Sequence, residues 1–163
     1  MHAAWILALW LGAGDKPAMV PAARVRAAHG AERVLADAAR SETVRVLLDR
    51  LAASDVIVYV EMVGTPDVPT ARTKLVTATP AARFLRIGIN AAQPAAAWTP
   101  LLAHELQHAV EIAEHADVRD DAGVRRLYAS IGHQHGIDQF ETDAAVQIER
   151  TVRAELRRLS VGS

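Results

Sequence analysis

Two histidines, His104 and His108, stand four residues apart in the segment LLAHELQHAVEIAEH, residues 101–115, and Glu105 follows the first of them directly. On an α-helix, residues i and i+4 project from the same face, so both imidazoles can reach one metal ion. Glu105 lies about 100° round such a helix from His104 and can approach a water molecule beside that ion. Zinc acidifies a bound water and a carboxylate can take its proton, which is why H-E-x-x-H indicates a hydrolytic zinc site.

The same residues also fit a simpler interpretation, in which the motif is only the polar face of a helix. At 100° per residue, His108, Glu111 and His115 fall within roughly 40° of His104. The opposite side carries apolar residues, namely Leu102, Leu106, Ala109 and Ala113. A polar stripe of this kind usually faces solvent, so a metal site requires a third ligand from elsewhere in the chain.

Composition restricts that third ligand to histidine, aspartate or glutamate, because the 163 residues include no cysteine. The final predicted helix, residues 138–160, offers Glu141, which projects from the centre of the helix's apolar stripe. A carboxylate on a buried helix face is costly unless it is paired or bound to a metal. We therefore predict Glu141 as the third ligand. The alternative is a salt bridge with an arginine, or a carboxylate that favours the start of its helix.

Hydrophobic patterns predict the elements that must position these residues. Ser41 is expected to cap a helix through Ser54, and Thr99 followed by Pro100 to begin the motif helix, which runs to about Glu114. Apolar and β-branched runs predict three strands, at residues 55–63, 73–79 and 83–90. A shorter helix at residues 120–132 and a loop at residues 132–137 precede the final helix. The order predicts an α+β domain with a short three-stranded sheet packed on the motif helix and further C-terminal helices.

The properties of the whole chain bound the remaining classes of function. A net charge of −1 creates no field that favours nucleic acid, so we expect no nucleic-acid partner. The apolar run HAAWILALWLGAG, residues 2–14, is shorter than the roughly 20 residues of a membrane-spanning helix, so no integral membrane span is expected. The run resembles the core of a signal peptide that lacks a basic start; the alternative is a short buried helix. We expect residues 1–14 to be a signal peptide, 15–163 a single domain, and the protein to be secreted or periplasmic.

Over residues 55–155, the order of strands, H-E-x-x-H helix and later glutamate resembles the gluzincin class of zinc metallopeptidases. The segment FETDAA, residues 140–145, looks like the E-x-x-A start of the glutamate helix in several small gluzincins. The resemblance implies a zincin-like fold with one zinc ion per chain, held by His104, His108 and Glu141. It implies hydrolysis of peptide bonds, with Glu105 as general base and acid. It also implies a peptide or protein substrate along an edge strand, for which residues 83–90 are the candidate.

The chain leaves two roles of the gluzincin pattern without a residue fixed by a motif. Tyr128, His133 and His135 lie between the ligand segments and are candidates for the group that stabilises the oxyanion, although each also fits an ordinary surface or loop residue. No aspartate matches the residue that often supports a ligand histidine; Glu111, one turn from His108, is the candidate for that role.

Two other hypotheses stay open beside the peptidase. One is a zinc-binding module without catalysis, and the other is a metal-free helical interaction domain in which the motif arose by chance. Glu105 favours the enzyme over the module, because a purely structural zinc site does not need a carboxylate at that position.

Overall fold

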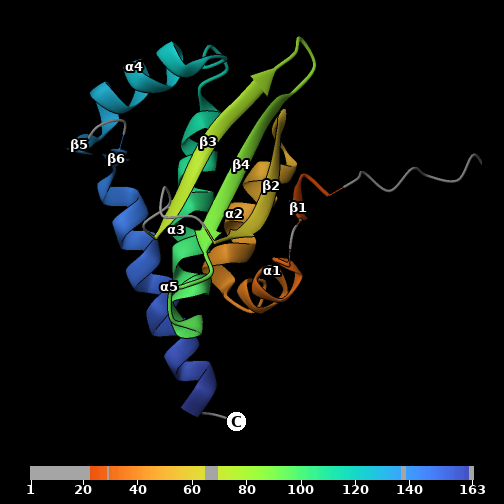
Figure 1. Cartoon of the computed structure of the whole chain (residues 1–163), viewed down its shortest axis with the longest axis vertical. Coiled ribbons are helices and arrows are strands. Elements are labelled where there is room, and N and C mark those ends of the chain that lie inside the picture. The colour runs from red at the N-terminus through yellow and green to blue at the C-terminus, as the bar shows by residue number, and fades with distance from the viewer. Residues whose placement is uncertain (1–22, 29, 65–69, 137–138, 162–163) are drawn as a thin grey trace, which may run out of the picture.

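The computed structural model describes residues 23–28, 30–64, 70–136 and 139–161 (Figure 1). The helices are α1 (Glu32–Ala38), α2 (Glu42–Ala52), α3 (Ala95–Glu114), α4 (Asp121–Ile131) and α5 (Asp143–Val161). The strands are β1 (Val25–Ala27), β2 (Val56–Val63), β3 (Ala71–Ala78), β4 (Arg83–Asn90), β5 (His133–Gly136) and β6 (Gln139–Glu141). The predicted signal peptide lies outside the described residues, so secretion stays a prediction. Within the described ranges, no helix combines the length and the apolar character needed to cross a membrane.

Four strands form one mixed sheet in the order β1-β2-β4-β3 (Figure 1). β1 and β4 run parallel to β2, whereas β3 runs antiparallel to β4 along the edge of the sheet. β5 and β6 form a separate antiparallel pair. The mixed α and β class is therefore confirmed, but the prediction of a three-stranded sheet is wrong. β1 has only three residues, too few to leave an alternating pattern in the sequence.

The prediction that residues 83–90 form the edge strand is also wrong. β4 lies between β2 and β3, and its inward residues Leu85, Ile87 and Ile89 are fully buried. The edge strand is β3. The sequence shows that the two strands are neighbours, but hydrophobic alternation does not show which of two paired strands lies outermost.

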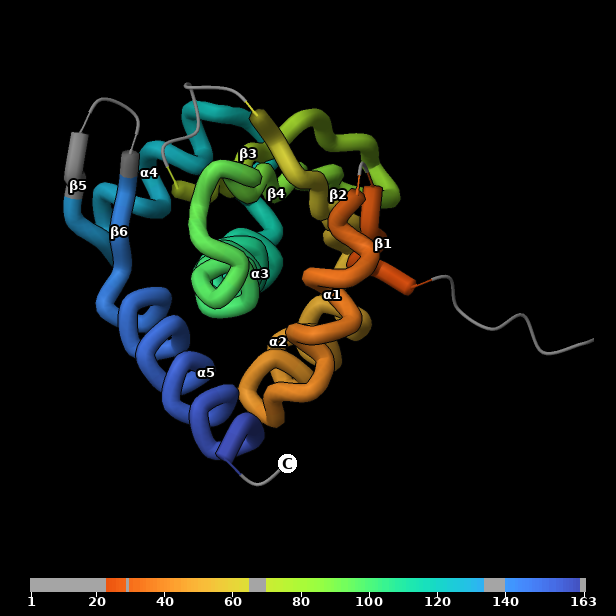
Figure 2. Tube along the Cα trace, turned by 60° about the horizontal axis from the view of Figure 1, so that its bottom comes forward, coloured from red at the N-terminus to blue at the C-terminus, as the bar shows by residue number. Residues whose placement is uncertain are grey.

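Helices α1, α2 and α3 cover one face of the sheet, and α5 packs against α3 (Figure 2). The core lies between β2, β4 and α3. Its fully buried apolar side chains include Val56, Val58, Val60, Leu85, Ile87, Leu102 and Leu106. The motif helix is thus held between the sheet and α5, and its histidines do not lie on an open surface.

Helix α3 begins earlier than predicted. Its N-cap is Pro94, so Thr99 is not a cap and Pro100 lies inside the helix. A proline in this position removes one backbone hydrogen bond, a cost that buried packing around it can offset. The predicted cap of α2 is confirmed, because the Ser41 hydroxyl accepts a hydrogen bond from the Val44 N–H at 3.1 Å.

The chain between α4 and α5 corrects two further predictions. Residues 132–137, predicted as a loop, contain β5, and α5 begins at Asp143 rather than at residue 138. Glu141 is therefore the last residue of β6 and does not lie on the apolar face of the final helix. The Thr142 hydroxyl accepts a hydrogen bond from the Ala145 N–H at 3.1 Å, which caps α5 just after Glu141. Polar residues in a strand this short give no period-2 signal.

A buried arginine fixes the C-terminal end of α3 to the sheet. Arg83, at the start of β4, forms an ion pair with Asp55 in which the nitrogen–oxygen distance is 2.5 Å, and its side chain is only 1% exposed. Its other donors reach carbonyls at the end of α3, at 2.6 Å from Ile112 and 2.9 Å from Ala113. A cation is favourable at this end of a helix. The contact fixes the position of α3, and therefore of its motif, relative to β4.

Candidate metal centre

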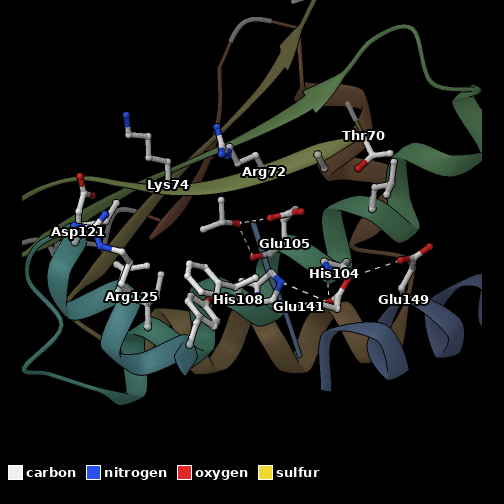
Figure 3. A pocket seen from close by; sticks show the side chains of 18 residues that line it. Thr70, Arg72, Lys74, His104, Glu105, His108, Asp121, Arg125, Glu141 and Glu149 are labelled. Atoms are coloured by element: carbon white, nitrogen blue, oxygen red, sulfur yellow. Dashed lines mark hydrogen bonds and ion pairs between the residues drawn. The ribbon is translucent and has the colours of Figure 1, made fainter. Parts of the chain in front are cut away.

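The three predicted ligands, His104, His108 and Glu141, converge at one point (Figure 3). Glu141 Oε1 lies 3.2 Å from His104 Nε2 and 3.9 Å from His108 Nε2. One ligand atom from each residue lies within 4.8 Å of the other two. Two ligands of a tetrahedral zinc ion, each about 2.0–2.1 Å from the metal, stand roughly 3.4 Å apart. The two distances from Glu141 lie on either side of that value, so the group could hold one metal ion.

Glu111 ties the segment that carries Glu141 to the motif helix. One of its carboxylate oxygens lies 2.8 Å from His108 Nδ1, and the other accepts a hydrogen bond from the Thr142 hydroxyl at 2.7 Å. Gln107 Nε2 donates to the same carboxylate at 3.2 Å. The residue next to Glu141 is thereby attached to α3, one turn beyond His108. This connection explains how a residue at the end of a short strand reaches the histidines.

The same carboxylate orients the His108 imidazole. A proton on Nδ1, shared with Glu111, leaves the lone pair of Nε2 directed toward Glu141. Burial alone lowers the pKa of His108, but the hydrogen bond to Glu111 and the nearby carboxylate charges outweigh burial and raise it. Burial raises the pKa of Glu111, and its hydrogen bonds, that to His108 first, lower it overall. This is the position that the sequence predicted for a supporting carboxylate.

A second carboxylate, Glu149 on α5, approaches the other histidine. Its Oε2 lies 3.3 Å from His104 Nδ1, and its other oxygen accepts from Arg153 at 2.6 Å. The approach to His104 is close but is not directed as a hydrogen bond, because His104 Nδ1 is buried without a hydrogen-bond partner among the described residues. The sequence alone does not identify Glu149 as a site residue. No sequence signal marks it, because its approach to His104 depends on the packing of α5 against α3.

Glu105, the predicted base, is buried beside the ligand group. One of its carboxylate oxygens lies 2.7 Å from the hydroxyl of Thr73 on β3, and the same hydroxyl lies 3.1 Å from the Glu105 carbonyl. Only 12% of the His104 side chain and 8% of the His108 side chain are exposed. The interpretation of the motif as a solvent-facing stripe is therefore wrong. These side chains lie in the interior, at the base of a cleft.

That cleft has a volume of about 650 Å³ and is bordered by β3, α3, α4 and the segment around Glu141. The N–H of Asn90 donates to the carbonyl of Thr70, so hydrogen-bonded pairs with β4 recur at Arg72 and Lys74. By the same alternation, the backbone groups of the residues between them, including Ala71 and Thr73, point away from β4. The edge of β3 therefore presents main-chain donors and acceptors to the cleft.

The candidates for the oxyanion stabiliser lie in different settings. The Tyr128 hydroxyl donates to the His108 carbonyl at 3.3 Å, and its ring contacts His108 edge-on and stacks on Phe140. Burial is the main cause that raises the pKa of this phenol well above its ordinary range. His133 is exposed on β5, and the side chain of His135 lies outside the described residues. Tyr128 therefore packs behind His108 with its hydroxyl directed at the helix backbone, and the oxyanion role stays a prediction.

No family model, no curated protein and no solved structure matches this chain. The interpretation of the site therefore rests on its geometry and on the motif.

Proposed function

We propose that the protein is a zinc-dependent peptidase of the gluzincin type, with a zincin-like arrangement of edge strand, motif helix and glutamate segment. One observation carries this proposal: His104, His108 and Glu141 converge beside the buried Glu105, directly under β3, which is the outermost strand of the sheet among the described residues. Two imidazoles and one carboxylate match the donor set of catalytic zinc, which keeps a fourth position open. The supporting contact of Glu111 with His108 belongs to the same chemistry.

The residues divide the reaction between them. Zinc held by His104, His108 and Glu141 would supply a Lewis acid that polarises a peptide carbonyl and acidifies water. Glu105 accepts the proton of the attacking water and then donates it to the nitrogen of the leaving amine. The Thr73 hydroxyl holds the Glu105 carboxylate in the cleft. Main-chain groups of β3 hydrogen-bond an extended substrate and so hold its backbone across the site.

Elemental analysis together with a hydrolysis assay tests the proposal. We expect one zinc ion per purified chain, retained in Asp143→Ala and lost in Glu141→Ala. Asp143 is the matched control because it is an exposed carboxylate two residues from Glu141. A mixture of unstructured peptides should be hydrolysed, with activity lost in a chelator and restored by zinc. Hydrolysis that persists in the chelator contradicts the metal mechanism, and zinc uptake without any hydrolysis would instead favour the non-catalytic zinc module.

A further inference from the structure

Thr73 on β3 contacts Glu105 twice through a single hydroxyl. Its oxygen lies 2.7 Å from the Glu105 carboxylate and 3.1 Å from the Glu105 main-chain carbonyl, and both contacts are drawn as dashed lines beside Glu105 in Figure 3. A hydroxyl has one proton to donate, and an ionised oxygen accepts it more strongly than a carbonyl does. The shorter contact is therefore a charge-assisted hydrogen bond from Thr73 to the carboxylate.

The main-chain carbonyl of Glu105 does not depend on this hydroxyl. Glu105 lies in the interior of α3, where the N–H four residues further along, that of Ala109, donates to its carbonyl. Loss of the Thr73 hydroxyl therefore leaves the helix bonds intact and removes a donor from the carboxylate alone.

Thr73 provides a rigid point of attachment for a flexible side chain. Its backbone is fixed in the sheet opposite Ile87 of β4, whose side chain is fully buried. A β-branched side chain has few rotamers, so the hydroxyl has a nearly fixed position. Glutamate has three rotatable bonds and loses more freedom when it is held in one conformation. The strand therefore determines where the Glu105 carboxylate lies in the cleft.

The contact leaves the two oxygens of the Glu105 carboxylate unequal. One accepts from Thr73, and within the described chain no hydrogen bond reaches the other. We propose that Thr73 is the positioning residue of the general base. It fixes one oxygen of Glu105, so that the other takes the proton of the attacking water and passes it to the nitrogen of the leaving amine. This inference rests on the proposed function, because it assigns a further residue to the same reaction.

Kinetics of two Thr73 variants on a peptide substrate separate positioning from packing. Thr73→Val keeps the shape of the side chain and removes the donor, whereas Thr73→Ser keeps the donor and removes a methyl group. We expect kcat to fall by about 10- to 100-fold in Thr73→Val with KM nearly unchanged, since displacement of a reacting group by about 1 Å costs on the order of 10²-fold in rate. Thr73→Ser should recover most of this loss. A packing role predicts the reverse order, because valine fills the space and serine does not.

The metal site should be unaffected by both variants. Competition with a chromogenic zinc chelator should give the wild-type zinc affinity, because the Thr73 hydroxyl contacts Glu105 rather than a ligand residue. Thr77→Val is the matched control. It makes the same substitution on the same strand, at an exposed residue that does not line the cleft, and it should keep the wild-type kcat.

A double-mutant cycle measured by urea denaturation in chelator tests the contact without any assay of activity. Thr73→Val leaves a buried carboxylate without its donor, so it should lower the unfolding midpoint of the wild-type protein. In the Glu105→Met background the same change should have little effect, because methionine has a similar length and no carboxylate.

Three results overturn the inference: additive losses in the cycle, a wild-type kcat in Thr73→Val, or a serine variant no faster than the valine variant. If the wild type hydrolyses peptides in a zinc-dependent way, each of these results leaves the peptidase intact. Coupling in the cycle together with a wild type that hydrolyses no peptide contradicts the peptidase and, with it, the role of Thr73.

Discussion

Two buried polar clusters lie against α3, and they differ in how fully their polar atoms are paired. At the C-terminal end, the guanidinium of Arg83 donates to Asp55 and to the carbonyls of Ile112 and Ala113. In the middle of the helix, ligand atoms of two histidines and Glu141 face one another, and His104 Nδ1 has no directed hydrogen bond within the described chain. A saturated network holds a fold together, whereas converging lone pairs leave a place for a cation. The first cluster, Arg83 with Asp55 and the carbonyls at the end of α3, is therefore a structural clamp. The second cluster is a candidate metal site.

The largest expected effect is on the rate of hydrolysis, and it comes from Glu105, which lies beside the second cluster. Glu105→Gln removes the proposed general base, so hydrolysis should fall about 10²- to 10⁴-fold while zinc content and folding are kept. Steady-state kinetics on a peptide substrate, with elemental analysis of the same preparation, measure both quantities. Glu114→Gln, at the exposed end of the same helix, is the control and should retain activity. An active Glu105→Gln protein would remove this carboxylate from the mechanism.

Substitutions in the clamp should have the opposite effect. They should lower the free energy of unfolding strongly and leave metal binding unchanged. Arg83→Met leaves Asp55 and the end of α3 without their cation, so the free energy of unfolding should fall by roughly 3–5 kcal/mol. Urea denaturation measures this loss. Arg86→Met, an exposed change on the same strand, should stay within about 0.5 kcal/mol of the wild type.

If Arg83→Met does not fold, Arg83→Lys keeps the comparison testable. Lysine retains the charge but cannot donate in the same fork, so we expect a loss between those of the other two variants. A wild-type unfolding free energy in Arg83→Lys would show that charge alone, rather than the saturated network, holds the end of α3.

The sequence predicted which side chains come together at the candidate site better than it predicted the path of the chain. The i, i+4 spacing of His104 and His108 needs only a helix, and the long apolar pattern around them made that helix predictable. Helical periodicity predicts Glu141 on the apolar face of the final helix, which is wrong, because Glu141 ends β6. The resemblance of FETDAA, residues 140–145, to a segment of several small gluzincins points to the same residue.

The features that sequence reasoning missed depend on tertiary contacts. Strand order in the sheet depends on which side of β4 the preceding strand β3 pairs with. The local pattern of RFLRIGIN, residues 83–90, does not contain that information. Glu149 approaches His104 only because α5 packs against α3. The sequence does not reveal that Arg83 is buried, since a buried arginine is rare and its acceptors come from residues about thirty positions away.

A smaller effect should separate the two carboxylates that support the histidines. Glu111→Gln breaks a 2.8 Å contact with His108 Nδ1, and such changes lower metal affinity about 10- to 100-fold. Glu149→Gln should lower it less, because its 3.3 Å approach to His104 is undirected and a quarter of its side chain is exposed. Competition with a chromogenic zinc chelator measures both affinities. A larger loss in Glu149→Gln would show that metal binding draws Glu149 into a direct interaction.

The smallest effect concerns the pH response of the clamp. The hydrogen bond from Arg83 is the main cause that holds the pKa of Asp55 below its usual range. The stability that Asp55 contributes is therefore complete above its unfolded-state pKa of about 3.9, and it is lost as the pH falls through the lower folded-state value. Urea denaturation in chelator, from about pH 6 to about pH 2, should show a difference between wild type and Asp55→Asn that shrinks only at the acidic end. In the Arg83→Met background, Asp55→Asn should leave the pH profile unchanged, and a difference that persists there would place the cause of the shift outside the clamp.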